Sequence, residues 1–348
     1  MRERATTMKA SMSEKKSTGS ETKSTGSEKK STGPVTKSTP VTRSTPVTRS
    51  TGEPAFAGFA WGVLGYNIAV ILWGAYVRAT GSGAGCGNHW PLCDGSVMLV
   101  SPDLHKTIEF IHRMMTGVDG PLIVLLVIWA FRVFPAGHAA RRAATLAGIF
   151  LVSEALIGAL LVKIQHVAQN ADAYSESAHL VNTLTLLACL TLTAWFGSGQ
   201  PAPRLPRKAA WMAGISLGAV MLLSITGVIA ALGDTLFPAA TLAAGLAQDF
   251  DPASSVLLRL RGLHPLIAAA VAAWLTLYAV GWLRVARPAA LRVVAMVWIQ
   301  LLAGLVNFLL QAPVWMQIVH LLIADLLWIS LVLLCASTSP ASNSMRSA

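Results

Sequence analysis

The sequence has few charged residues: Asp, Glu, Lys and Arg make up 12% of its 348 residues, whereas 54% are hydrophobic. About a quarter of the residues in a soluble domain are charged, so this composition excludes an ordinary soluble fold and indicates a polytopic membrane protein. The net charge of +11 lies mainly in residues 1–54, where eleven Lys and Arg face five Glu, and in short loops between apolar segments. This distribution reflects membrane topology, and we expect no nucleic-acid partner.

The sequence also has few cysteine residues, and its first 54 residues contain no aromatic side chain. Four cysteines do not make a disulfide framework, and two of them, Cys189 and Cys335, lie in apolar segments as packing residues. Residues 1–54 have no aromatic side chain and no apolar core of a signal peptide. Their recurring Lys-Ser-Thr-Gly and Thr-Pro-Val-Thr units predict a disordered cytoplasmic tail. Residues 338–348 are interpreted as a second, short tail.

Long apolar segments fill the rest of the chain. About 20 helical residues cross a bilayer core, and eight segments reach that length, which predicts an all-α integral membrane protein with eight transmembrane helices. Basic residues in alternate loops place both termini in the cytoplasm by the positive-inside rule. The helices are expected at Phe56–Ala79, Ile108–Phe131, Ala143–Val162, Ser177–Phe196, Ala209–Leu232, Leu263–Leu283, Ala289–Leu310 and Met316–Ala336.

A histidine is expected in the first turn or so of each even-numbered helix, at the outer face of the membrane. These residues are His112, His179, His264 and His320. The order of the elements repeats once, which predicts two duplicated four-helix bundles, at residues 55–200 and 201–337. An even number of helices per half keeps the two halves parallel.

Two imidazoles from facing helices can hold a metal or the iron of a haem. A bare zinc or copper site would recruit further Cys or carboxylate ligands, and only the first half offers one at this depth, Glu109. The histidines are therefore interpreted as haem ligands, paired within each half. Small residues that let helices part around a haem are Gly74, Gly117, Gly158, Gly227 and Gly304.

The two pairs differ in the residue one helical turn before the first histidine. Glu109 precedes His112, whereas Arg261 precedes His264. Ionisable groups at membrane depth indicate function, although Glu109 also has a reading as an interfacial anchor. The carboxylate is predicted to accept a proton or position water. Arg261, and Arg78 near the end of the first helix, are predicted to contact haem propionates.

Six motifs, in this order and at these spacings, resemble the haem A synthase family, whose members oxidise haem O to haem A in the membrane. The resemblance covers the chain from Trp61 to Leu334. The motifs are YVRATGSG at 76–83, WPLCDG at 90–95, EFIHR at 109–113, HLVN at 179–182, LHP at 263–265 and HLLIADLLW at 320–328.

This resemblance implies an oxidoreductase that converts the C8 methyl group of haem O to a formyl group by two successive hydroxylations, during biogenesis of haem A-containing terminal oxidases. It implies that His264 and His320 hold a permanent haem b as cofactor. It further implies that His112 and His179 face the substrate haem, beside Glu109 as the catalytic carboxylate. The implied partners are haem O, a haem O synthase, a membrane electron acceptor and the lipid bilayer of the bacterial plasma membrane.

Some bacterial members of this family resemble the chain in having a cysteine pair in the first outer loop, here Cys86 and Cys93. A disulfide is expected between them, with structural and redox roles equally open. The main alternative function is a di-haem b electron-transfer protein, with all four histidines as permanent ligands. A haem transporter would need helices interrupted near the midplane, and a thiol oxidoreductase would need a second cysteine pair.

Overall fold

A computed structural model describes residues 53–87, 89–99, 102–164 and 169–338. In this part of the chain the secondary structure is helical, apart from a single bridge between Cys93 and Ser96. Eight helices are long and apolar enough to cross a membrane, which confirms the expected number. The predicted tails at 1–54 and 338–348 lie almost wholly outside the described residues.

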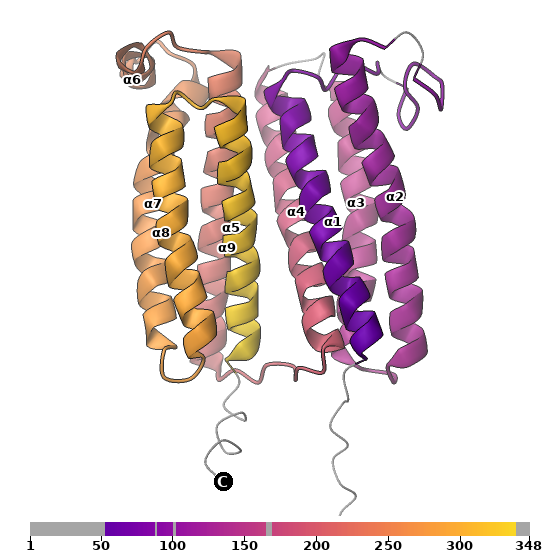
Figure 1. Ribbon diagram of the computed structural model, residues 1–348. Helices are drawn as coiled ribbons and strands as arrows, with labels where there is room; N and C mark the ends of the chain where they lie inside the picture. The colour runs from indigo at the N-terminus through magenta and orange to yellow at the C-terminus, as the bar shows by residue number, and fades with distance from the viewer. Residues whose placement is uncertain (1–52, 88, 100–101, 165–168, 339–348) are drawn as a thin grey trace, which may run out of the picture. The chain divides into compact units, whose positions relative to one another are not determined.

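The helices of the first half are α1 (Pro54–Ala79), α2 (Leu104–Val133), α3 (Ala139–Ile164) and α4 (Gln169–Gly197). Those of the second half are α5 (Arg207–Leu236), α6 (Leu242–Phe250), α7 (Val256–Gly281), α8 (Arg287–Leu309) and α9 (Val314–Ser337). The start of α1 and the end of α9 lie at the same end of the helices (Figure 1).

Helices α2 and α7 are among those that begin earlier than the apolar pattern predicts, and in both a capping side chain precedes the apolar segment. The carboxylate of Asp103 accepts the backbone N–H of Lys106 at 2.8 Å, and α2 starts at Leu104. Ser255 caps α7 in the same way, through the N–H of Leu258. Such caps satisfy N–H groups that a helix start leaves unpaired.

The earlier starts correct the predicted depth of the histidines. His112 is the ninth residue of α2 and His264 the ninth of α7. His179 is the eleventh residue of α4, and His320 the seventh of α9. At 3.6 residues per turn, the four histidines lie about two to three turns inside their helices, rather than in the first turn.

Helix α6 was not expected from the sequence. It has nine residues, too few to cross a bilayer, and starts where the Thr241 hydroxyl accepts the N–H of Ala244. It follows α5 and precedes α7 in the chain, and Figure 1 shows it at the same end of the helices as the loop that joins α1 to α2. The corresponding end of each half therefore carries an ordered connection.

One apolar core runs through both halves. Helix α4 packs against α5 and α9, and α1 packs against α9. The core includes Leu187 of the first half and Leu331 of the second, both buried. The indole of Trp328 in α9, also buried, donates a hydrogen bond to the carbonyl oxygen of Leu184 at 2.8 Å. The two halves therefore share one apolar core.

Candidate functional site

The four histidines share one packing arrangement, in which each imidazole lies against a glycine of the preceding long helix. A Cβ atom added at Gly74 would lie 2.9 Å from Cε1 of His112, closer than real Cβ atoms approach. The corresponding distance from the facing histidine Cε1 is 3.1 Å at Gly227, 3.1 Å at Gly304 and 3.9 Å at Gly158. The contacting pairs are His112 with Gly74, His179 with Gly158, His264 with Gly227 and His320 with Gly304.

Gly117 does not belong to this arrangement, although the sequence placed it with the other four. Nothing lies within 4 Å of a Cβ atom added there. The expectation that Gly117 makes room for a haem stays a prediction. A glycine on a histidine's own helix, five residues further along, faces a different direction.

Several of the histidines have a buried ring nitrogen without a partner. Among the described residues, Nδ1 of His112, His179 and His320 forms no hydrogen bond, whereas Nδ1 of His264 lies 2.9 Å from the Thr226 hydroxyl. Buried polar atoms are nearly always bonded in folded proteins, so these nitrogens fit a role as metal ligands.

A haem suits this donor set better than a bare metal ion. The described residues contain no group of three or more His, Cys, Asp or Glu side chains that could hold an ion. His112 and His179 lie near enough for their charges to interact, and so do His264 and His320. Two imidazoles from facing helices are sufficient axial ligands for haem iron.

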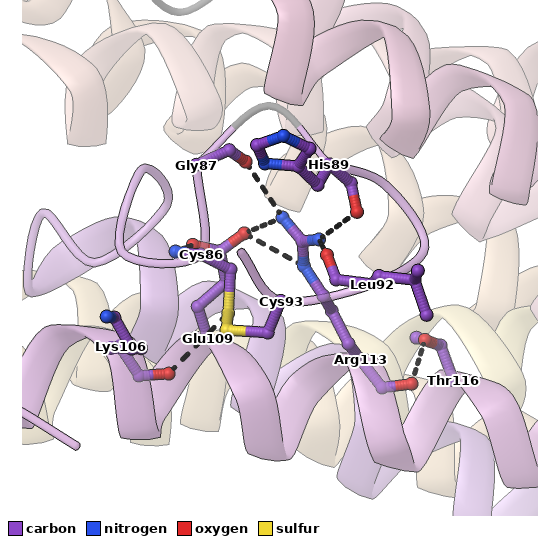
Figure 2. Close-up of polar contacts among 9 residues, drawn as sticks. All are labelled: Cys86, Gly87, His89, Leu92, Cys93, Lys106, Glu109, Arg113 and Thr116. Atoms are coloured by element: carbon purple, nitrogen blue, oxygen red, sulfur yellow. Dashed lines mark hydrogen bonds and ion pairs between the residues drawn. A yellow bond between two sulfur atoms is a disulfide. The ribbon is translucent and has the colours of Figure 1, made fainter. Parts of the chain in front are cut away.

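Glu109 is buried, with 3% of its surface exposed, and both of its carboxylate oxygens are bonded. Oε1 accepts from the guanidinium of Arg113, at 3.0 Å from Nε and also from Nη2. Oε2 accepts the backbone N–H of Cys86 at 2.8 Å. Figure 2 shows this carboxylate turned toward the loop that precedes α2. Glu109 therefore contacts the loop, whereas His112 on the same helix contacts α1.

The loop is fastened to α2 through Arg113 and closed by a disulfide. Cys86 and Cys93 are joined with an S–S distance of 2.04 Å, so the expected disulfide is present. The Arg113 guanidinium donates to the carbonyl oxygens of Leu92, of His89 at 3.4 Å and of Gly87 at 3.4 Å (Figure 2). These bonds and the ion pair with Glu109 hold the loop over the start of α2.

A second ion pair fixes the same loop. Lys106 Nζ lies 2.7 Å from the Asp94 carboxylate, and its hydrogen bond lowers the pKa of Asp94. Backbone packing is also close, because a Cβ atom at Gly85 would lie 2.7 Å from the carbonyl of His105. The position at Gly85 therefore has no room for a side chain.

Arg261 occupies the place in the second half that corresponds to Glu109, and it too holds an outer connection. Its Nε donates to Asp249 of α6 at 2.7 Å, and its Nη1 donates to Asp234 of α5 at 3.1 Å. Nη2 lies 3.3 Å from the carbonyl oxygen of Gly245. The guanidinium thus ties α6 to α7 above His264, and its contact with a propionate stays a prediction.

The substitution Asp249→Ala is expected to lower the melting temperature by several degrees. Arg261 then loses Asp249, the buried one of its two carboxylate partners, and a hydrogen bond to a charged group contributes about 1.5–3 kcal/mol. Thermal unfolding in detergent, followed by circular dichroism, measures the change. Asp251→Ala is the matched control, since Asp251 is exposed and accepts only from the nearby N–H of Ala253. Equal melting temperatures for Asp249→Ala and the wild type would show that the bond between Arg261 and Asp249 does not stabilise the protein.

Arg78 of α1 reaches into the second half. Its Nη2 lies 3.4 Å from the side-chain oxygen of Gln317, which is three residues before His320 in α9. Its Nη1 is buried and has no hydrogen-bond partner among the described residues. A buried guanidinium N–H without a partner can donate to an anionic ligand group, and the contact of Arg78 with a propionate stays a prediction.

Glu154 of α3 also belongs to this region. Its Oε1 lies 3.6 Å from Nε2 of His179. Its Oε2 accepts from the Asn182 side chain at 2.5 Å, and Oε1 accepts from the Thr183 hydroxyl. In the sequence, the one indication of a role for Glu154 is that it is an acidic residue inside an apolar helix. The distance of Glu154 from His179 depends on how α3 packs against α4, which the sequence does not show.

Comparison with known proteins places the chain in a family. A sequence profile of the family described as cytochrome oxidase assembly protein matches residues 57–332. A Thermus thermophilus protein named protoheme IX farnesyltransferase is 45% identical over 291 residues, which cover 81% of this chain and 48% of that protein.

Two proteins named Heme A synthase are also similar. That of Halalkalibacterium halodurans is 36% identical over 137 residues, 39% of this chain and 45% of its own. That of an Exiguobacterium species is 33% identical over 145 residues, 42% of this chain and 46% of its own. The chain spans about half the length of these curated relatives. It belongs to the cytochrome oxidase assembly protein family, which is the family of the haem A synthases.

Proposed function

We propose that this protein is a haem A synthase of the bacterial plasma membrane. It oxidises the C8 methyl group of haem O to a formyl group by two successive hydroxylations, each of which removes two electrons. The observation that carries the proposal is that the two histidine pairs have different charged residues beside them. A buried carboxylate, Glu109, lies one turn from His112, whereas Arg261 takes that place before His264. A protein that only passes electrons between two permanent haems needs no such difference.

The two halves have separate tasks in this proposal. Residues 55–200 hold haem O between His112 and His179, and residues 201–337 hold haem b through His264 and His320. Haem b supplies a redox centre through which electrons leave for a membrane acceptor. The recurrence of a histidine packed on a glycine in both halves supports a duplication. The basic loops support cytoplasmic termini.

Glu109 serves as a fixed negative charge and as an acceptor that orients water. Oxidation of a methyl group beside a conjugated ring builds positive charge on the substrate, and a preorganised charge stabilises it. The ion pair with Arg113 and the bond from the Cys86 N–H hold the carboxylate in place. Since both oxygens already accept hydrogen bonds, orienting water is favoured over taking its proton outright.

A haem O synthase in the same membrane supplies the substrate. Haem O carries a farnesyl-derived group, so farnesylation of protohaem must precede the oxidation proposed here. The support is that a relative 45% identical to this chain is named protoheme IX farnesyltransferase. The partner of this chain is therefore proposed to be an enzyme of that class.

The proposed function is tested by extracting haems from membranes of a host that makes haem O. Membranes with this protein are expected to contain haem A, and membranes without it only haem O and haem b. Chromatography of the extracts separates the three haems by polarity. Unchanged haem O together with additional haem b in membranes containing the protein would instead favour the di-haem electron-transfer alternative.

A further inference from the structure

Two polar residues occupy matching places in the two halves, and they differ in charge. Glu154 lies four residues before Gly158 in α3, and Gln300 lies four residues before Gly304 in α8. Each of these glycines faces a histidine of the following helix, His179 or His320. The first half therefore has a carboxylate where the second half has a neutral amide.

Both side chains approach the histidine that their glycine faces. Glu154 Oε1 is 3.6 Å from Nε2 of His179, and Gln300 Nε2 is 3.1 Å from Nε2 of His320. On both histidines the other ring nitrogen, Nδ1, is buried and has no hydrogen-bond partner among the described residues. Nε2 of each ring is thus directed at a polar side chain, which is a carboxylate for His179 and an amide N–H donor for His320.

The Glu154 carboxylate is held in place by α4. Asn182 donates to it at 2.5 Å, Thr183 also donates to it, and Asn182 in turn accepts from the Ser153 hydroxyl at 2.6 Å. A carboxylate inside a membrane protein is costly and indicates a function. The hydrogen bonds reduce that cost and leave the charge directed at His179.

We propose that Glu154 is a positioning residue that orients His179 and makes this imidazole a stronger donor than His320. A histidine that binds a metal through one nitrogen usually donates its other N–H to an acceptor, and a carboxylate acceptor raises its basicity. The amide nitrogen of Gln300 donates to His320 instead of accepting from it, so it does not raise the basicity of that ring in this way. This inference rests on the proposed function, and it identifies Glu154, along with Glu109, as a reason why oxidation takes place in the first half.

The test uses the full-length protein, purified in detergent with its resident haem and titrated with haem O. Glu154→Gln is expected to lower kcat about ten- to hundredfold with little change in KM. It should also raise the reduction potential of the first-half haem and shift its absorption spectrum. Gln300→Glu is expected to lower the potential of the second-half haem.

Asp119→Asn is the matched control. Asp119 is another buried acid of the first half, and it accepts from Asn67 at 2.8 Å. Its replacement is expected to leave the spectrum and potential of the first-half haem unchanged. Spectra and potentials for Glu154→Gln equal to those of the wild type would overturn the inference, as would an equal shift in Asp119→Asn.

The design separates this inference from the proposed function. A wild-type protein that forms no haem A refutes the proposed function, while the spectrum and potential after titration with haem O still decide the role of Glu154. If Glu154→Gln does not fold, Thr183→Val removes one donor to the carboxylate and keeps its charge. For Thr183→Val, a small shift of the absorption spectrum of the first-half haem relative to the wild type supports the inference. A spectrum equal to that of the wild type rejects it.

Discussion

Replacing Glu109 with glutamine is expected to reduce haem A formation by about two orders of magnitude while leaving both haem sites occupied. The amide keeps an oxygen for the Cys86 N–H, but it removes the negative charge that we propose stabilises the developing positive charge of the substrate. Loss of a single preorganised electrostatic partner typically costs a factor of about 10²–10³ in turnover. Haem extraction after a fixed growth period measures the haem A formed, and the reduced-minus-oxidised spectrum measures occupancy.

Glu109→Ala is a more severe replacement, to be compared with Glu109→Gln. It leaves the buried Arg113 guanidinium with only backbone carbonyl partners, and breaking a buried ion pair in this way costs about 3–5 kcal/mol. We therefore expect Glu109→Ala to lose both haem A formation and thermal stability, and Glu109→Gln to lose mainly haem A formation. Haem A formation by Glu109→Gln at the wild-type level would show that the charge of Glu109 is not needed for the reaction. Glu109 would then have only the structural role of fastening the loop.

Substitution of the histidine-facing glycines is expected to empty the two haem sites one at a time. Gly74→Val places a Cβ atom 2.9 Å from Cε1 of His112 with two methyl groups beyond it, so the imidazole must leave its place. Gly304→Val does the same to His320, where the Cβ distance is 3.1 Å. The first variant should lose binding of added haem O, and the second should lose the resident haem.

Absorbance titration of the purified variants with haem O, and the haem content on purification, measure these two losses separately. Gly117→Val is the matched control because nothing lies within 4 Å of that position. It should retain both haems. Loss of the resident haem in Gly74→Val, with binding of haem O unaffected, would show that the two pairs have been assigned to the wrong halves.

The sequence predicted the membrane-spanning helices well because their signal is local. Each is a long apolar segment, and composition alone decides it. The predicted helix starts were less accurate. Asp103 and Ser255 cap α2 and α7 several residues before the apolar segments, and an apolar pattern takes no account of such polar caps. Helix α6 was missed because nine amphipathic residues between two long helices resemble a loop.

Within the site, the residue types could be predicted, whereas most of their partners could not. Arg113 is four residues from Glu109, a spacing that favours an ion pair on any helix. The bond from the Cys86 N–H to Glu109 depends on how a loop folds back, and the distance between Glu154 and His179 depends on helix packing. Arg261 was predicted to contact a propionate, which stays a prediction, whereas its contacts with two aspartates of α5 and α6 could not be predicted from the sequence.

One turn of α1 contacts both halves of the molecule. Gly74 receives His112 of the first half, and Arg78, four residues later, reaches Gln317 beside His320 of the second. A helical turn is rigid, so a displacement of α1 that accommodates a ligand at one site changes the contacts at the other. The two binding equilibria are then thermodynamically linked, and such linkage is reciprocal. If the two histidine pairs hold a resident haem and a substrate haem as proposed, the factor by which one changes the affinity for the other is the same in both directions.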